Sequence, residues 1–342
     1  MTESSLYVTS SGAVVLGNAV VCDGFVRDIP FRVQTHIHSD HFSHFHTSKG
    51  SQDILLTEAT RSLLINELNA DLAYRQNLKA LQVGEPFQFS GGKITVFSNG
   101  HMLGSVQVCV EYGNGHRLGY SSDFSWPLSE VIQVDGLVVD STCGSPDSVR
   151  KYSQTDAEGR FLQIINDRRG RGPVHLKAHR GTLQRTLQLL SSEVRMPIIG
   201  SRRLVAEVEV YRSYGYMLSD VVDCMSQNGI DIAKSGAYLR VFGTRDTLPT
   251  DPKCGTSIAL SAFGLNGNDP VLEYAEGAYR VALSDHADFH GTIDYVKATN
   301  AKFVLVDNSR GGHAFELAHE IRERLGIVAR ASENHGSKEW GV

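Results

Sequence analysis

A short stretch, THIHSDH at residues 35–41, decides how this chain is interpreted. The β-prone run FRV at residues 31–33 precedes it, so His36 and His38 stand at the end of a predicted strand. Side chains alternate along a strand, and both imidazoles therefore point to the same face. A following turn brings Asp40 and His41 back over that face. Three imidazoles and one carboxylate in so short a stretch are the ligands that a pair of zinc-like divalent metals requires.

Further candidate ligands stand at the ends of other predicted strands. His101 lies between glycines in GHMLGS at residues 100–105, shortly after a strand predicted over residues 94–97. Asp123 and Asp140 end two more predicted strands, and the carboxylate of Asp123 could bridge two ions. Taken singly, an Asp or a His at a strand end is more often a turn former than a ligand. Together, however, they share the strand ends at which α/β folds gather their active sites.

Length and composition are those of a soluble globular protein. A chain of 342 residues predicts two domains, and 41% hydrophobic with 21% charged residues excludes disorder and fibres. No apolar run approaches the length of a membrane span, and the N-terminus shows no secretory signal, so we expect a cytoplasmic protein. The five cysteines contain no C-x-x-C pair that would indicate a zinc ribbon or a redox couple.

The order of predicted elements indicates one α/β domain that is split by an insertion. Short strands dominate the first 145 residues, with one helix predicted over residues 58–69. Helices are then predicted over residues 159–165, 182–191, 202–214 and 219–227, before strands and helices alternate again from residue 279. We therefore expect domain segments at residues 1–165 and 276–342 and an inserted α/β cap at residues 166–275.

Charge is distributed unevenly along the chain. The formal net charge is only −5, but residues 168–212 carry ten Lys or Arg against three Glu. Such segregation is typical of a surface that binds a polyanion. A pair of helices with a solvated basic face would give the same pattern, and charge alone does not separate the two interpretations.

These motifs resemble a known protein superfamily. The pattern HxHxDH at residues 36–41, followed by His101 and Asp123, resembles the metallo-β-lactamase superfamily. The form of the His101 motif, Asp140 in DST and the stretch SDHAD at residues 284–288 resemble its β-CASP branch of nucleic-acid nucleases. The resemblance covers essentially the whole chain, and the compact length is similar to exonucleases associated with DNA ligase and helicase genes. It implies an αββα sandwich with an inserted β-CASP cap.

The resemblance implies a hydrolase that cleaves phosphodiester bonds. Two zinc ions, with manganese as the alternative, would activate a hydroxide. The implied ligands are His36, His38, Asp40, His41, His101, Asp123 and Asp307. Asp40, Asp140 and His286 are the expected catalytic residues, with His286 as the general acid that Asp140 orients and keeps protonated. The alternatives are a structural histidine at position 286 and an Asp140 that caps the following turn.

Two segments depart from the pattern of the branch. RNA-cleaving members carry a metal-binding His where this chain has Asp307, and DNA-cleaving members carry an apolar residue there. His313 is the alternative ligand. The stretch AHRGTLQ at residues 178–184 resembles a Gly-Arg-x-Gln segment of the cap with Gly and Arg transposed. The residues expected to contact phosphates of a nucleic acid are Arg180, Arg185, Arg202 and Arg203.

DNA is the favoured substrate, because the DNA-directed branch has Asp at position 140 and lacks a His at position 307. We thus expect a DNA exonuclease in repair, with a DNA ligase or helicase system as partner and no membrane. A β-CASP ribonuclease that processes RNA is the alternative. The inserted cap argues against a small-molecule ester or lactone hydrolase, and the complete metal motifs argue against a non-catalytic scaffold.

Overall fold

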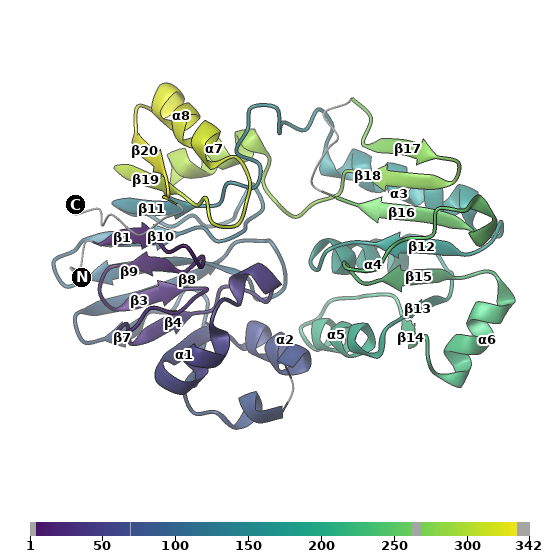
Figure 1. Cartoon of the computed structure of the whole chain (residues 1–342), viewed down its shortest axis with the longest axis horizontal. Coiled ribbons are helices and arrows are strands. Elements are labelled where there is room, and N and C mark those ends of the chain that lie inside the picture. The colour runs from purple at the N-terminus through teal and green to yellow at the C-terminus, as the bar shows by residue number, and fades with distance from the viewer. Residues whose placement is uncertain (1–4, 69, 262–267, 334–342) are drawn as a thin grey trace. The chain divides into compact units, whose positions relative to one another are not determined.

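The structure is a computed structural model that describes residues 5–68, 70–261 and 268–333 (Figure 1). Its contacts divide the chain into two compact units. The first unit joins Met1–Val149 to His286–Val342, and the second unit is the intervening segment Arg150–Asp285. The predicted segments 166–275 and 276–342 include residues 262–267 and 334–342, which lie outside the described residues.

Two sheets form the body of the first unit. The first has the order β1 (Leu6–Val8), β2 (Val14–Leu16), β3 (Val20–Cys22), β4 (Phe31–Val33), β5 (Asp53–Thr57) and β6 (Leu78–Leu81). The second has the order β20 (Val328–Ala331), β19 (Phe303–Val306), β11 (Gly136–Val139), β10 (Arg117–Tyr120), β9 (Val106–Tyr112), β8 (Gly92–Ser98) and β7 (Phe87–Phe89). Strands β10, β11, β19 and β20 run parallel, so their carboxyl ends meet at one edge.

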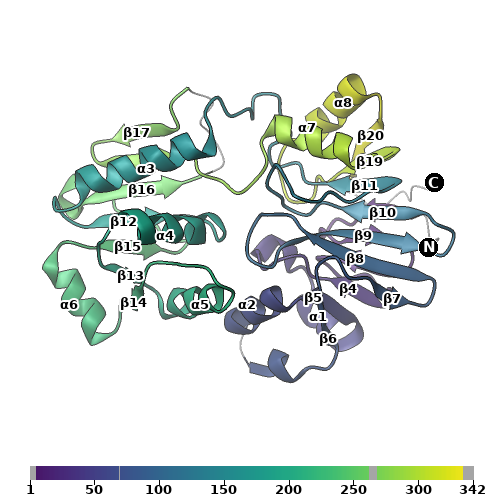
Figure 2. The same ribbon diagram turned by 180° about the vertical axis from the view of Figure 1, so that it is seen from behind.

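A shared hydrophobic core joins these two sheets. Val14 and Val33 of the first sheet lie in the same buried group as Val96 and Val108 of the second. On the other face of the second sheet, α7 (Phe289–Ala298) and α8 (Ala314–Leu325) contribute buried side chains to a second core. Helices α1 (Phe45–Ser51) and α2 (Glu58–Leu68) contact β5 of the first sheet (Figure 2). The first unit is therefore layered as helices, sheet, sheet and helices.

The second unit contains one sheet with helices. Its strand order is β14 (Val221–Asp223), β13 (Ile198–Gly200), β15 (Leu239–Phe242), β12 (Val174–Lys177), β16 (Thr256–Leu260), β18 (Ala278–Val281) and β17 (Val271–Ala275). Only β17 pairs antiparallel to its neighbour among these described strands. The helices are α3 (Gln154–Arg168), α4 (Thr182–Glu193), α5 (Arg202–Ser213) and α6 (Gln227–Ser235). The mixed α/β class predicted from the sequence is confirmed.

One predicted helix is wrong. Residues 219–227 contain β14, a turn and only the first residue of α6. Val221 and Val222 are β-branched, and they pair in parallel with Ile198 and Ile199 of β13, which favours the extended backbone. Helix α6 begins after Ser226, whose hydroxyl accepts a hydrogen bond from the backbone N–H of Gly229.

Helices in the described part of the chain are too short or too polar to span a membrane. The longest of those named above, α3, has 15 residues, of which Ala157, Phe161 and Ile165 are buried.

Candidate metal centre

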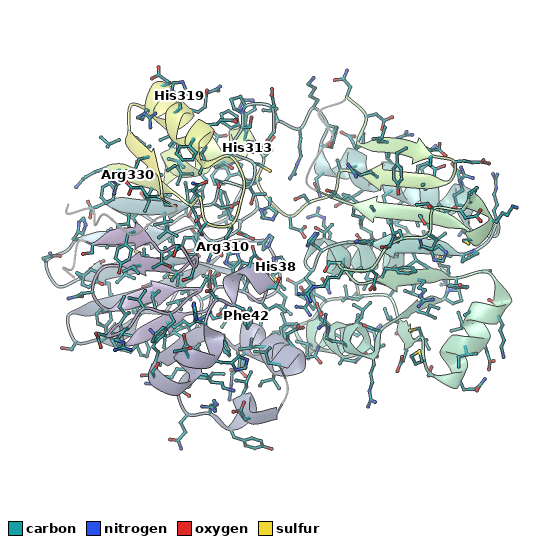
Figure 3. All side chains as sticks on the ribbon, in the orientation of Figure 1. His38, Phe42, Arg310, His313, His319 and Arg330 are labelled. Carbon is teal, nitrogen blue, oxygen red and sulfur yellow. The ribbon has the colours of Figure 1, made fainter. Side chains whose placement is uncertain are left out.

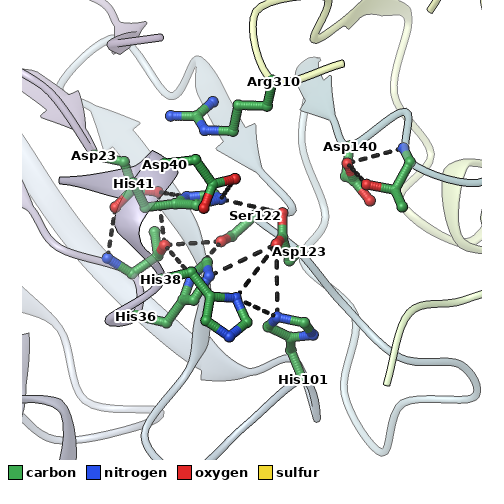
Figure 4. Close-up of polar contacts among 12 residues, drawn as sticks. Asp23, His36, His38, Asp40, His41, His101, Ser122, Asp123, Asp140 and Arg310 are labelled. Carbon is green, nitrogen blue, oxygen red and sulfur yellow. Dashed lines mark hydrogen bonds and ion pairs between the residues drawn. The ribbon is translucent and has the colours of Figure 1, made fainter. Parts of the chain in front are cut away.

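Four histidines from two segments surround the carboxylate of Asp123 (Figure 4). Its Oδ2 lies 3.7 Å from Nε2 of His36, 3.6 Å from Nε2 of His101 and 4.0 Å from Nδ1 of His38. Its Oδ1 lies 3.3 Å from Nε2 of His41. These residues follow β4, β8 and β10, so the strand-end positions noted in the sequence do converge. One donor atom from each of His36, His38, His101 and Asp123 lies within 4.8 Å of the others.

The protonation of His36 and Asp123 suits a divalent metal. Burial and the neighbouring charges of His41 and His38 hold the pKa of His36 well below its usual value, so its imidazole is neutral. Burial opposes ionisation of Asp123, but His41, His38 and His286 together hold its pKa well below the usual range. Nε2 of His36 is buried and makes no hydrogen bond within the described residues. A neutral imidazole and an ionised carboxylate are forms that bind metal, so His36 and Asp123 fit a divalent ion. His41 differs: burial and Arg310 oppose its protonation, but Asp123 and Asp23 raise its pKa to about 10, so it would release a proton on binding an ion.

Hydroxyl groups fix the orientation of His36. Its Nδ1 lies 3.0 Å from Oγ1 of Thr35 and 3.3 Å from Oγ of Ser122. The Thr35 hydroxyl donates in turn to Oδ2 of Asp23, at 2.7 Å. A partner at Nδ1 leaves Nε2 as the nitrogen that faces Asp123, and such outer contacts hold metal-binding imidazoles in place.

Asp23 is a site residue that the sequence analysis missed. It is fully buried, and its carboxylate accepts hydrogen bonds from Nδ1 of His41 at 2.7 Å and from the backbone N–H of Thr35 at 2.8 Å. The only signal in the sequence is its place directly after the apolar run at residues 19–22. Because an Asp-Gly pair is typical of a turn, that signal is weak. In the structure this carboxylate turns Nε2 of His41 toward Asp123 and Asp40.

We expect Asp23→Asn to weaken metal binding by roughly tenfold to hundredfold, the usual effect of losing a carboxylate that orients a metal-binding histidine. Competition with a chromophoric chelator measures this affinity. Asp28→Asn is the matched control, because Asp28 is exposed and lies outside the groups of candidate ligands. Equal affinities for the Asp23 variant and wild type would contradict this orienting role.

Arg32 supports the backbone of the loop that carries His36, His38 and His41. It is fully buried and donates to the carbonyl oxygens of His41 at 3.0 Å and of Ser43 at 2.9 Å. It also donates twice to Oε1 of Gln34, whose amide donates to the carbonyl of His36 at 2.7 Å. Burial lowers the pKa of Arg32 to about 10. These contacts fix the backbone on which the histidines stand.

Asp40 lies next to His41 (Figure 4). Its Oδ2 is 3.7 Å from Nε2 of His41, and its side chain is 54% exposed. Nε2 of His41 thus lies within 3.7 Å of a carboxylate oxygen of both Asp40 and Asp123.

His286 and Asp140 lie next to the ligand group. Nε2 of His286 is 4.0 Å from Oδ2 of Asp123, and its ring centre is 4.6 Å from that of His101. Nδ1 of His286 is 3.5 Å from Oδ2 of Asp140. The other oxygen of Asp140 accepts from the backbone and the hydroxyl of Thr142. Asp140 therefore both caps a turn and faces His286.

The described residues contain two groups of candidate ligands, one of His36, His38, His101 and Asp123 and one of Asp23, His36 and His41. Neither group includes Asp307 or His313. Oδ1 of Asp307 accepts hydrogen bonds from Ser309, and Oδ2 is in an ion pair with Arg310. His313 lies at the start of α8 with its Nδ1 3.4 Å from Oε1 of Glu316 (Figure 3).

The basic residues singled out in the second unit differ in their surroundings. Arg180 is paired with Glu207 at 3.2 Å, and Arg185 is paired with Glu158 at 2.5 Å. Arg202 and Arg203 are exposed in the first turn of α5. Strands β12 and β13, which precede these segments, both run parallel to β15. Arg180, Arg202 and Arg203 therefore follow strand ends at the same edge of this sheet.

Comparison with known proteins identifies relatives, although no family model matches the chain. An uncharacterised protein in the lig 3′ region of Acidianus ambivalens is 30% identical over 126 residues. The match covers 36% of this chain and 89% of that protein. The chain belongs to the family of this protein.

Two longer proteins also resemble the chain. An RNase J-like protein of Methanocaldococcus jannaschii is 24% identical over 274 residues, which cover 71% of this chain and 62% of that protein. A probable DNA ligase of Opitutus terrae is 23% identical over 336 residues, which cover 90% of this chain and 29% of the ligase. The chain thus spans less than two thirds of either relative.

The fold of this family member is also found in a solved structure. A protein of unknown function from Enterococcus faecalis V583 superposes with a TM-score of 0.57 at 9% identity. The match covers 81% of this chain and 74% of that protein. At this identity the likeness concerns the fold alone.

Proposed function

We propose that this protein is a metal-dependent phosphodiesterase, a β-CASP nuclease of the metallo-β-lactamase superfamily that degrades DNA from its ends. The observation that carries the proposal is the convergence of His36, His38, His101 and Asp123, with the His286–Asp140 pair beside them. The layered first unit and the intervening second unit are consistent with an αββα sandwich and its β-CASP cap.

We propose two ligand sets. His36, His38, His101 and Asp123 would hold one divalent ion. Asp40, His41 and Asp123 would hold a second, since Nε2 of His41 lies 3.7 Å from Asp40 and 3.3 Å from Asp123. Zinc suits these nitrogen and oxygen donors, with manganese as the alternative. Bound ions would supply charge stabilisation at a phosphate and a water of lowered pKa.

His286 serves as the general acid in this proposal. Its Nε2 side faces Asp123, and its Nδ1 side faces the carboxylate of Asp140 at 3.5 Å. The negative charge of Asp140 stabilises the imidazolium form, so that His286 holds a proton for the leaving 3′ oxygen.

DNA is the proposed substrate because position 140 is Asp and position 307 is not His. The similarity to part of a probable DNA ligase supports a role in DNA repair together with a ligase. The RNase J-like relative supports the alternative, a ribonuclease. We propose a cytoplasmic location for either activity.

Single-turnover assays with end-labelled single- and double-stranded DNA and RNA test this proposal. We expect metal-dependent release of nucleotides from DNA ends, with slower cleavage of RNA. Faster cleavage of RNA would make the protein a ribonuclease, and hydrolysis of neither polymer by metal-loaded protein would refute a nuclease.

The positive charges at the sheet edge of the second unit should contribute to the binding of DNA. For Arg202→Ala with Arg203→Ala, we expect weaker binding of DNA of any sequence. The slope of log Kd against log salt concentration should also fall by about two, because about two phosphate contacts are lost. Fluorescence anisotropy over a salt series measures both quantities. Lys234→Ala, an exposed position on α6 of the same unit, is the control. An unchanged salt dependence would remove these arginines from the proposed interface.

A further inference from the structure

The segment that follows β19 is locked against the end of β11. The backbone N–H of Asp307 donates to the carbonyl of Val139 at 2.9 Å, and that of His313 donates to the carbonyl of Ser141 at 2.9 Å. The hydroxyl of Ser141 donates to the carbonyl of Asp307 at 2.6 Å. Gly312 has φ +94°, and a Cβ there would lie 2.4 Å from the backbone carbonyl oxygen of Ser141. Only glycine fits this contact, so the segment has one defined path.

This path buries the guanidinium of Arg310. The side chain is 9% exposed and forms an ion pair with Asp307. Its Nη2 donates to the carbonyl of Gly12, where an added Cβ would lie 3.3 Å from the same nitrogen. A guanidinium has five N–H donors. Nε of Arg310 is buried and makes no hydrogen bond within the described residues, so the arginine is fixed while at least one donor is left over.

The charge of Arg310 also interacts with charged residues of the candidate metal centre. Burial opposes its charge, but Tyr120, Asp307, Asp23 and Asp123 raise its pKa. Burial and the positive charge of Arg310 oppose protonation of His41, but Asp123 and Asp23 raise its pKa to about 10. Figure 4 shows the guanidinium on the side of the group where Asp40 and His41 lie.

Two roles are open to Asp307, and the contacts favour one of them. To bind a metal, Asp307 would have to leave Arg310 as a buried charge without its partner, which is strongly unfavourable. A fixed cation beside the second set of ligands repels a further cation and attracts an anion. The anion that the proposed function brings to this place is the phosphate group, for which guanidinium groups are well suited.

We propose that Arg310 binds a non-bridging oxygen of the substrate phosphate and that Asp307 positions Arg310 rather than binding a metal. This inference rests on the proposed function for the identity of the anion. It assigns to Asp307 a role other than the ligand role expected from the sequence.

The experiment compares Arg310→Met, Asp307→Asn and the double variant. Each is loaded with zinc, and its zinc content and its Kd for inorganic phosphate are measured. We expect wild-type zinc content in all three. Phosphate affinity should fall by roughly tenfold to hundredfold in Arg310→Met, as for loss of a charged hydrogen bond. Asp307→Asn should show a similar loss, and the double variant should be no worse than either, because one residue acts through the other.

A second comparison keeps the test valid if a single variant unfolds. The double variant leaves no buried charge without a partner, and thermal unfolding shows whether it is folded. Glu320→Gln with Arg324→Met removes a 2.6 Å ion pair on α8 and serves as the control for charge loss.

Two results would overturn the inference. Loss of zinc in Asp307→Asn but not in Arg310→Met would make Asp307 a ligand. Wild-type phosphate affinity in a folded Arg310→Met or double variant would leave Arg310 without a role in binding phosphate. Neither readout needs nuclease activity, so a wild-type protein that cleaves no nucleic acid would refute the proposed function separately.

Discussion

Asp123→Asn should abolish hydrolysis of nucleic acid, with kcat lowered by about a thousandfold or more. Oδ1 and Oδ2 of Asp123 face different histidines, so this one carboxylate belongs to both proposed ligand sets. Asparagine keeps the shape but removes the negative charge that two divalent ions would share. Single-turnover assays and metal analysis of the purified protein measure the two losses.

Asp294→Asn is the matched control for this substitution. Asp294 is an exposed residue on α7 of the same unit. We expect it to retain wild-type activity and metal content. If Asp123→Asn also retained them, the metal centre assigned to these residues would be wrong.

His286→Ala should lower kcat by roughly a hundredfold to ten-thousandfold while leaving metal content unchanged, as expected for loss of a general acid. The structure places this histidine 4.0 Å from Asp123 and 3.5 Å from Asp140. A substrate whose leaving group needs no proton, such as bis(4-nitrophenyl) phosphate, should be cleaved nearly as well by the variant as by wild type. A histidine with only a structural role would slow both substrates equally.

Asp140→Asn should reproduce the same pattern more weakly, since it removes the charge that stabilises the imidazolium form of His286. Thr142→Val is the control, because it removes only a hydroxyl that donates to the other oxygen of Asp140. If Thr142→Val had the same effect on kcat, turn capping would explain the role of Asp140.

Part of the candidate site could be predicted from local spacing. Alternation along an extended segment puts His36 and His38 on one face, although β4 itself ends at Val33. Asp123 follows β10, which lies in the other sheet of the first unit, so its approach to the histidines depends on the packing of the two sheets and not on spacing.

Long-range hydrogen bonds left no comparable signal in the sequence. Asp23 meets His41 because the chain returns through β4, and its Asp-Gly pair is typical of an ordinary turn. Asp307 follows a strand end like the other carboxylates, but it forms an ion pair with Arg310, three residues later in the chain. Whether a strand-end carboxylate faces a metal or a guanidinium depends on the path of the following loop, which the glycines at residues 311 and 312 permit but do not specify.

The buried Arg32 has a consequence for the proposed metal centre. Its donors reach the carbonyl oxygens of His41 and Ser43, the hydroxyl of Ser48 and Oε1 of Gln34, so protein groups alone hold the backbone that carries the histidines. In the proposed metal-bound form, one divalent ion would then exchange for another while this backbone keeps its path, and the identity of the ion supplied would set the reactivity of the centre.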